Sequence, residues 1–224
     1  MNFLALTVTE NTIQYLRHRI IQGELPPGHR LNEMMLCSEL NISSAPLREA
    51  FRLLQNEHMV FSIPRKGTFV AGVSVEDCRD IYKVREMIEC FAVDLIRERN
   101  IRDLSGLESA LASASNFAMP SSDNKEEMLS YQQAFVDFHE KLIETTGNQW
   151  AVRVYNSIRS NLARYIFIGA FVPNRSRDSL EEHKRILDLL KRRDYEQAKE
   201  LIRFHINSLF NIIAPRIKKI HAKQ

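Results

Sequence analysis

Three histidines in the second half of the chain, His139, His183 and His205, lie in separate stretches whose apolar residues recur at helical spacing. Each falls on the apolar side of its stretch, which predicts that the three side chains point inward from different helices. A single inward histidine is more often a hydrogen-bonded core residue than a ligand. Three can converge, however, and neutral imidazoles in a shielded cavity are good ligands for zinc, nickel or similar ions. The spacing alone leaves both interpretations open.

A metal ion held by three histidines and a water molecule could also form a hydrolytic centre. The sequence has no HExxH spacing and places no carboxylate beside the histidines as a general base. Asp137 is two residues from His139, about 200° around a helix, and should not serve as a ligand. We therefore expect a binding protein rather than an enzyme, with a metal-dependent hydrolase as the less favoured alternative.

Apolar periodicity predicts that residues 74–224 form an all-α bundle of six or so helices around these histidines. Ser74 and Asp77 form a capping box that opens the first helix and sets the domain boundary near residues 72–76. The further predicted helices are about 103–118, 126–146 and 148–171, followed by two that open at capping boxes, Ser179 with Glu182 and Asp194 with Gln197.

Ahead of the boundary, the stretch from Leu40 to Gln55 has the pattern of a helix that reads DNA. Its apolar residues recur at i, i+3, i+4 and i+7, while Arg48 and Arg52 share the opposite face. Ser43 or Ser44 can cap its start. A short helix with guanidinium groups on its outer face suits the major groove, although an ordinary surface helix with solvated arginines has the same pattern.

The segments around this helix favour the DNA-binding interpretation. Two helical segments precede it, the second capped by Asn32 and ending at Asn41, and the short connector makes a helix-turn-helix. Two short strands, 59–63 and 68–71, follow with a turn at 64–67. Residues 1–73 are therefore predicted to form a winged helix-turn-helix, whose hairpin tip reaches the DNA backbone or minor groove.

Composition bounds the class of protein. The 224 residues are 44% hydrophobic and 26% charged, and only seven glycines and seven prolines are present, as in a mostly helical protein. Three cysteines without C-x-x-C spacing, and the absence of an apolar run near 20 residues or of a signal-peptide pattern, favour a cytoplasmic protein without a membrane partner. The net charge of +3 permits nucleic-acid binding without requiring it.

The region from Leu25 to Val70 resembles the winged helix of GntR-family bacterial regulators, and the remainder resembles the helical FCD effector domain of the FadR subgroup. The P-x-R-E-A element at 46–50 and the R-x-G-T-F-V wing at 65–70 carry the resemblance. It implies a ligand-responsive transcription regulator, a homodimer on double-stranded operator DNA. The DNA-binding residues expected on this basis are Ser43, Ser44, Arg48, Arg52, Arg65, Lys66, Gly67 and Thr68.

The resemblance also implies roles for residues in the second half of the chain. Metal-binding FCD domains use three histidines that map onto His139, His183 and His205, and an arginine that maps onto Arg85 lines their effector cavity. This implies a divalent transition metal such as zinc or nickel, with open positions for water or a carboxylate effector, an organic or sugar acid. A surface salt bridge between Arg85 and Glu89, four residues on, is the favoured alternative for that arginine.

The sequence departs from the family pattern at four positions. Met34 and Ser44 stand where arginines that touch DNA are usual, which leaves Arg48 as the main reader. His58 replaces a glycine after the recognition helix, and we expect it to adopt a left-handed conformation. Phe135 occupies the place of an aspartate ligand, which would also allow a metal-independent sensor with an apolar pocket.

Overall fold

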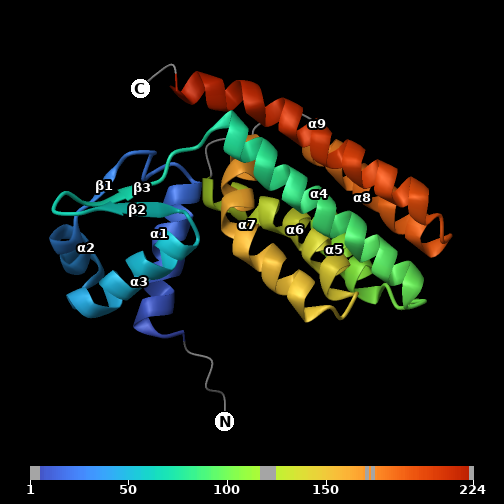
Figure 1. Ribbon diagram of the computed structural model, residues 1–224, viewed down its shortest axis with the longest axis horizontal. Helices are drawn as coiled ribbons and strands as arrows, with labels where there is room; N and C mark the ends of the chain where they lie inside the picture. The colour runs from blue at the N-terminus through green and yellow to red at the C-terminus, as the bar shows by residue number, and fades with distance from the viewer. Residues whose placement is uncertain (1–5, 117–124, 170–171, 173–174, 222–224) are drawn as a thin grey trace, which may run out of the picture. The chain divides into compact units, whose positions relative to one another are not determined.

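The computed structural model describes residues 6–116, 125–169, 172 and 175–221. The chain divides into two compact units, residues 1–73 and 74–224. The first holds three helices and a small sheet, and the second is all-helical in its described residues (Figure 1). The predicted fold class, a winged helix-turn-helix followed by a helical bundle, is confirmed. Among the described helices, none is long and apolar enough to cross a membrane.

The first unit is built on three helices, α1 (Val8–Ile21), α2 (Glu33–Leu40) and α3 (Ser44–Asn56). Asn32 caps α2 by accepting hydrogen bonds from the backbone N–H groups of Met34 and Met35, and Asn41 ends it in the left-handed conformation. Helix α3 begins after Ser43, which makes no side-chain capping bond. Its apolar face is buried against α1, as the periodicity predicted: Leu47, Ala50, Phe51 and Leu54.

The wing is a three-stranded antiparallel sheet in the order β1-β3-β2. Strands β2 (Val60–Ile63) and β3 (Gly67–Val70) form the predicted hairpin, in register from Val60 opposite Val70. The short strand β1 (Arg30–Leu31) was not predicted, and it pairs with β3. His58 has a φ of 56°, so the predicted left-handed conformation between α3 and the hairpin is confirmed.

The second unit contains α4 (Val75–Glu98), α5 (Ser105–Asn116), α6 (Lys125–Glu144), α7 (Gln149–Gly169), α8 (Arg175–Lys191) and α9 (Tyr195–His221). Helices α4 and α9 run side by side, and α4 also packs against α6 and α7 (Figure 1). Ser74 caps α4 by accepting a bond from the Asp77 N–H at 2.9 Å, and Asp194 caps α9. Helix α4 therefore contacts at least three other helices of this unit.

The predicted start of the penultimate helix was wrong. Ser179 was expected to open it with Glu182 as capping partner, but α8 already begins at Arg175, four residues earlier. The carboxylate of Glu182 does not turn back to the Ser179 backbone, because it binds the Arg175 guanidinium and the His205 ring instead. Ser179 lies within the helix and faces an internal cavity.

Candidate metal centre and DNA-binding surface

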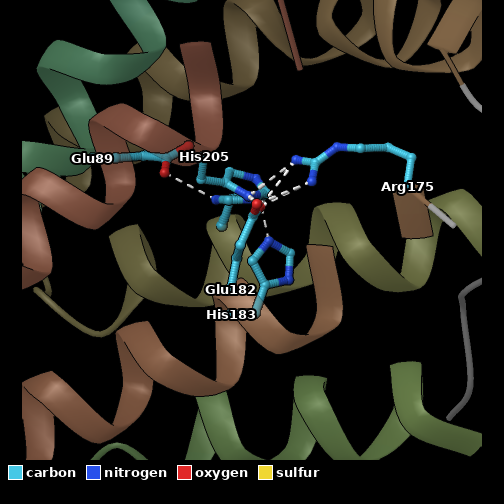
Figure 2. A network of polar contacts seen from close by, with 6 residues as sticks. Glu89, Arg175, Glu182, His183 and His205 are labelled. Atoms are coloured by element: carbon cyan, nitrogen blue, oxygen red, sulfur yellow. Dashed lines mark hydrogen bonds and ion pairs between the residues drawn. The ribbon is translucent and has the colours of Figure 1, made fainter. Parts of the chain in front are cut away.

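The three histidines meet in the core of the bundle, one each from α6, α8 and α9. His139, His183 and His205 are each at most 3% exposed, and one nitrogen from each ring lies within 4.8 Å of the others. The Nε2 atoms of His183 and His205 are 3.3 Å apart (Figure 2). Helical spacing puts each ring on its buried face, and the packing of three helices brings the rings together.

Two carboxylates hold two of these rings by their other nitrogen. Nδ1 of His139 is 2.9 Å from Oε2 of Glu89, and Nδ1 of His205 is 2.5 Å from Oε2 of Glu182. A carboxylate can only accept, so each Nδ1 carries the proton and each Nε2 keeps a free lone pair. In Figure 2 the carboxylate of Glu182 lies between Arg175 and His205. In metal sites, a carboxylate on the outer nitrogen of a histidine fixes the ring and directs its other nitrogen toward the metal.

The ring of His183 is oriented by packing. It stacks on Phe138 with the centroids 4.5 Å apart and the planes inclined by 10°. Its Nδ1 is buried without a hydrogen-bond partner among the described residues. Its Nε2, by contrast, lies among the convergent nitrogens. His183 is therefore the least hydrogen-bonded member of the group.

Each carboxylate is paired in turn with a buried arginine. Arg85 donates from Nε to Oε1 of Glu89 at 2.6 Å, and the Arg175 Nη atoms contact both oxygens of Glu182 at 3.0–3.2 Å. Two buried triplets result: the first triplet is Arg85, Glu89 and His139, and the second triplet is Arg175, Glu182 and His205. The two carboxylates balance the two guanidinium charges in this site.

Burial keeps the histidines neutral. The pKa of His139, of His183 and of His205 lies well below its usual range, chiefly because desolvation disfavours the imidazolium. The nearby Arg85 guanidinium lowers the pKa of each ring further. Neutral imidazoles, two of them with an Nε2 that can only accept, fit a transition metal such as zinc, for which histidine nitrogen is a preferred ligand.

A small cavity of about 40 Å³, partly open to solvent, adjoins the histidines. Arg85, Phe135 and Ser179 line it together with all three rings, and Phe135 supplies an apolar wall where the family pattern has an aspartate. Both terminal nitrogens of Arg85, Nη1 and Nη2, are buried and have no hydrogen-bond partner in the part of the chain that the structure describes. A guanidinium with two free parallel donors can accept a carboxylate in bidentate fashion.

Two expectations about this site were wrong. The Arg85–Glu89 pair exists, but it is buried at 1% and 0% exposure rather than lying on the surface. Carboxylates do lie beside the histidines, although they come from positions on other helices that sequence spacing could not connect. Asp137, as expected, is not in the histidine group, and its carboxylate accepts a bond from Gln133.

The predicted DNA-reading residues lie at the start and on the outer face of α3. Ser43, Ser44, Arg48 and Arg52 are exposed. Arg48 donates to Glu33 of α2 at 2.6 Å, and Arg52 pairs with Glu49 on its own helix. Acidic side chains of the same unit thus hold both arginines.

The wing presents the other predicted contacts. Arg65 and Lys66 are exposed at the turn, where Arg65 has a φ of 62° and Gly67 a φ of 112°. A Cβ at Gly67 would come within 3.2 Å of the Arg30 side chain, so glycine also makes room for that arginine. The Thr68 hydroxyl is 3.0 Å from that of Ser62 across the hairpin. Arg30 is a basic residue at the wing that sequence reasoning missed, because β1 was not predicted.

Comparison with known proteins finds a matching family for each of the two units. The family described as bacterial regulatory proteins, gntR family, matches residues 8–70, and the family described as FCD domain matches residues 80–208. The uncharacterized HTH-type transcriptional regulator YdhC of Bacillus subtilis is 28% identical over 193 residues, which are 86% of this chain and 84% of that protein. The gluconate operon transcriptional repressor of Bacillus licheniformis is 27% identical, over 77% of this chain and 68% of that protein. The solved structure of Escherichia coli McbR/YncC, 20% identical, covers 95% of this chain and 99% of its own with a TM-score of 0.74, and so shares the fold.

Proposed function

The chain belongs to the gntR family of bacterial regulatory proteins and carries an FCD domain, and from this premise we propose that it is a metal-assisted carboxylate sensor that controls operator binding. Residues 1–73 bind the DNA, and residues 74–224 bind the effector and form the dimer. The observation that carries the proposal is the group of three buried histidines beside the unpaired guanidinium fork of Arg85.

His139, His183 and His205 would hold the metal through one ring nitrogen each, and zinc or nickel is the expected ion. The ion would supply a Lewis-acidic centre with open positions for a carboxylate oxygen. The positive charges of the two arginines in the site already cancel the negative charges of the two glutamates. A divalent cation therefore adds uncompensated positive charge to a buried site, which favours an anionic effector.

The effector is proposed to be a small organic or sugar acid. Nη1 and Nη2 of Arg85 are buried without partners, which is costly unless a ligand completes their hydrogen bonds. Phe135 lines the cavity and would give the carbon chain of the acid an apolar surface to contact. The name of the gluconate operon repressor of Bacillus licheniformis, one of the similar proteins, is in keeping with this class of ligand.

We propose that a homodimer reads a two-fold operator, with Arg48, Arg52 and the wing of each copy on one half-site. A second copy would cover the exposed apolar side chains of Met87, Phe91 and Phe204. These belong to the adjacent helices α4 and α9, and the charged neighbours Glu86 and Arg203 already pair within the chain. Effector binding would favour one arrangement of the bundle and change operator affinity by its differential binding energy.

The experiment combines elemental analysis of the purified full-length protein with a thermal-shift screen of organic and sugar acids, with and without added Zn²⁺. We expect about one metal per chain and an acid-dependent rise in melting temperature, both lost in His183→Ala. His29→Ala, which removes an exposed histidine of the first unit, serves as the matched control. An acid response without metal would support the metal-independent sensor, and no response to either would contradict the proposal.

A further inference from the structure

The two triplets have the same order, arginine to glutamate to histidine, but they use their guanidinium groups differently. In the second triplet, Arg175 contacts Glu182 through both Nη atoms, and only its Nε lacks a partner. In the first triplet, Arg85 contacts Glu89 through Nε alone, and Nη1 and Nη2 remain free. Only the first triplet can therefore offer a fork of two parallel donors to an anion.

We propose that Glu89 is a positioning residue that couples anion binding at Arg85 to metal binding at His139. The proposal rests on the function given above. Glu89 has no exposed surface, and its two oxygens are divided between the partners: Oε1 accepts from Arg85 and Oε2 from His139. One carboxylate thus lies between the proposed anion site and a proposed metal ligand.

The coupling follows from charge sharing in a site of low dielectric constant. An anion on Nη1 and Nη2 takes part of the positive charge that Arg85 otherwise directs at Glu89. The carboxylate then accepts more strongly from Nδ1–H of His139, which makes Nε2 a better donor to the metal. By linkage, a metal on His139 must strengthen anion binding by the same factor.

The second triplet lacks this property and supplies the control. Glu182 holds Nδ1 of His205 much as Glu89 holds that of His139. Its arginine, however, has a single unpaired donor and cannot take a carboxylate in bidentate fashion while it holds Glu182. Glu182 should therefore support metal affinity without transmitting the presence of an anion.

The test is calorimetric titration of the full-length protein with Zn²⁺, in the absence and presence of saturating acetate, for the wild type, Glu89→Gln and Glu182→Gln. In the wild type we expect acetate to tighten zinc binding by about 5-fold or more, the lower end of usual coupling energies. Both variants should bind zinc about 10–100-fold more weakly, the usual cost of losing the carboxylate that holds a histidine ligand. Acetate should keep its full effect in Glu182→Gln, whereas in Glu89→Gln only the part that comes from acetate bound to zinc itself should remain.

Acetate also binds free zinc and lowers its concentration. This decrease is the same in every titration, so it cancels when the variants are compared with the wild type. Circular dichroism verifies folding, and if Glu89→Gln does not fold, Arg85→Lys replaces it. That variant keeps one donor for Glu89 but has no fork, so acetate should tighten its zinc binding less than that of the wild type. An acetate effect as large in Glu89→Gln or Arg85→Lys as in the wild type overturns the coupling alone. A wild type that binds zinc without an acetate effect also overturns it, whereas a wild type that binds no zinc overturns the proposed metal site as well.

Discussion

The buried Arg85–Glu89 pair makes a quantitative prediction about what it contributes to stability. Breaking a buried ion pair by removing one partner leaves an uncompensated charge, which typically costs about 3–5 kcal/mol. Both side chains are within 1% of complete burial, so the upper part of that range applies to Arg85→Met and to Glu89→Leu. With an m value of about 2 kcal/mol per M, either change lowers the urea midpoint by about 2 M.

The double variant Arg85→Met with Glu89→Leu should recover most of this loss. It removes two buried donors that have no partner, Nη1 and Nη2 of Arg85, and it leaves one new unpaired group, Nδ1 of His139. Each such group costs about 1–3 kcal/mol, so the removal of two more than offsets the one that is created. We expect the free energy of unfolding of the double variant to lie within about 1–2 kcal/mol of that of the wild type. The double variant should also show no response to organic acids.

The assay is urea unfolding of the four proteins in EDTA, followed by circular dichroism and by the emission of Trp150, the only tryptophan in the chain and part of the second unit. The four free energies form a double-mutant cycle that gives the coupling energy of the pair. Single variants within about 1 kcal/mol of the wild type would refute the reasoning. The reasoning would also be refuted if the double variant lost as much free energy of unfolding as the two single variants together. Arg85 and Glu89 would then contribute to stability independently of each other.

Four further predictions follow from the same contacts. Arg48→Ala should weaken specific binding to an operator selected from random DNA by about 1–3 kcal/mol, about 5–150-fold by fluorescence anisotropy, and unchanged affinity would contradict its role as the main reader. Lys66→Ala should weaken binding to all sequences alike and reduce the slope of log K against log salt by about one, which a salt titration measures. His183→Ala should abolish tight zinc binding in a metal titration while His29→Ala binds as the wild type does, and equal loss in both would point to general unfolding. In EDTA, the protein should lose stability as the pH falls below about 6.5: burial lowers the pKa of the three site histidines in the folded state, so the unfolded chain binds more protons. The loss is at most about 1.4 kcal/mol per pH unit for each histidine, and urea midpoints that rise on acidification would exclude it.

The parts of the fold that could be predicted are those whose signal is local. Periodicity and capping residues placed the recognition helix, the hairpin and the start of α4 at Ser74, because each depends on residues a few positions apart. Strand β1 has two residues and exists only by pairing with β3, so it has no periodicity to detect. The same limit applies to the capping box at Ser179. The local motif is present, but the carboxylate of Glu182 binds Arg175 and His205 instead of the Ser179 backbone.

The candidate site divides in the same way. The inward direction of the three histidines followed from the apolar residues around them, and the structure brings the rings together. Glu89 and Glu182 could not be assigned, because each meets a histidine of another helix, 50 and 23 residues away in the chain. The i, i+4 spacing of Arg85 and Glu89 predicted their pairing. It could not show that the pair is buried, since burial depends on how α4 packs against its neighbours.

The pairing of Arg48 with Glu33 has a consequence for how the protein would find its target. On DNA of arbitrary sequence, the arginine must give up a carboxylate to gain a phosphate, and this exchange of one anion for another brings little net gain. Arg52 is in the same situation with Glu49. A guanine edge presents two acceptors, O6 and N7, and so adds a sequence-dependent gain that a phosphate does not. The expected result is a short dwell time on most of the genome, so that few copies are sequestered away from the operator and the search along the chromosome is fast.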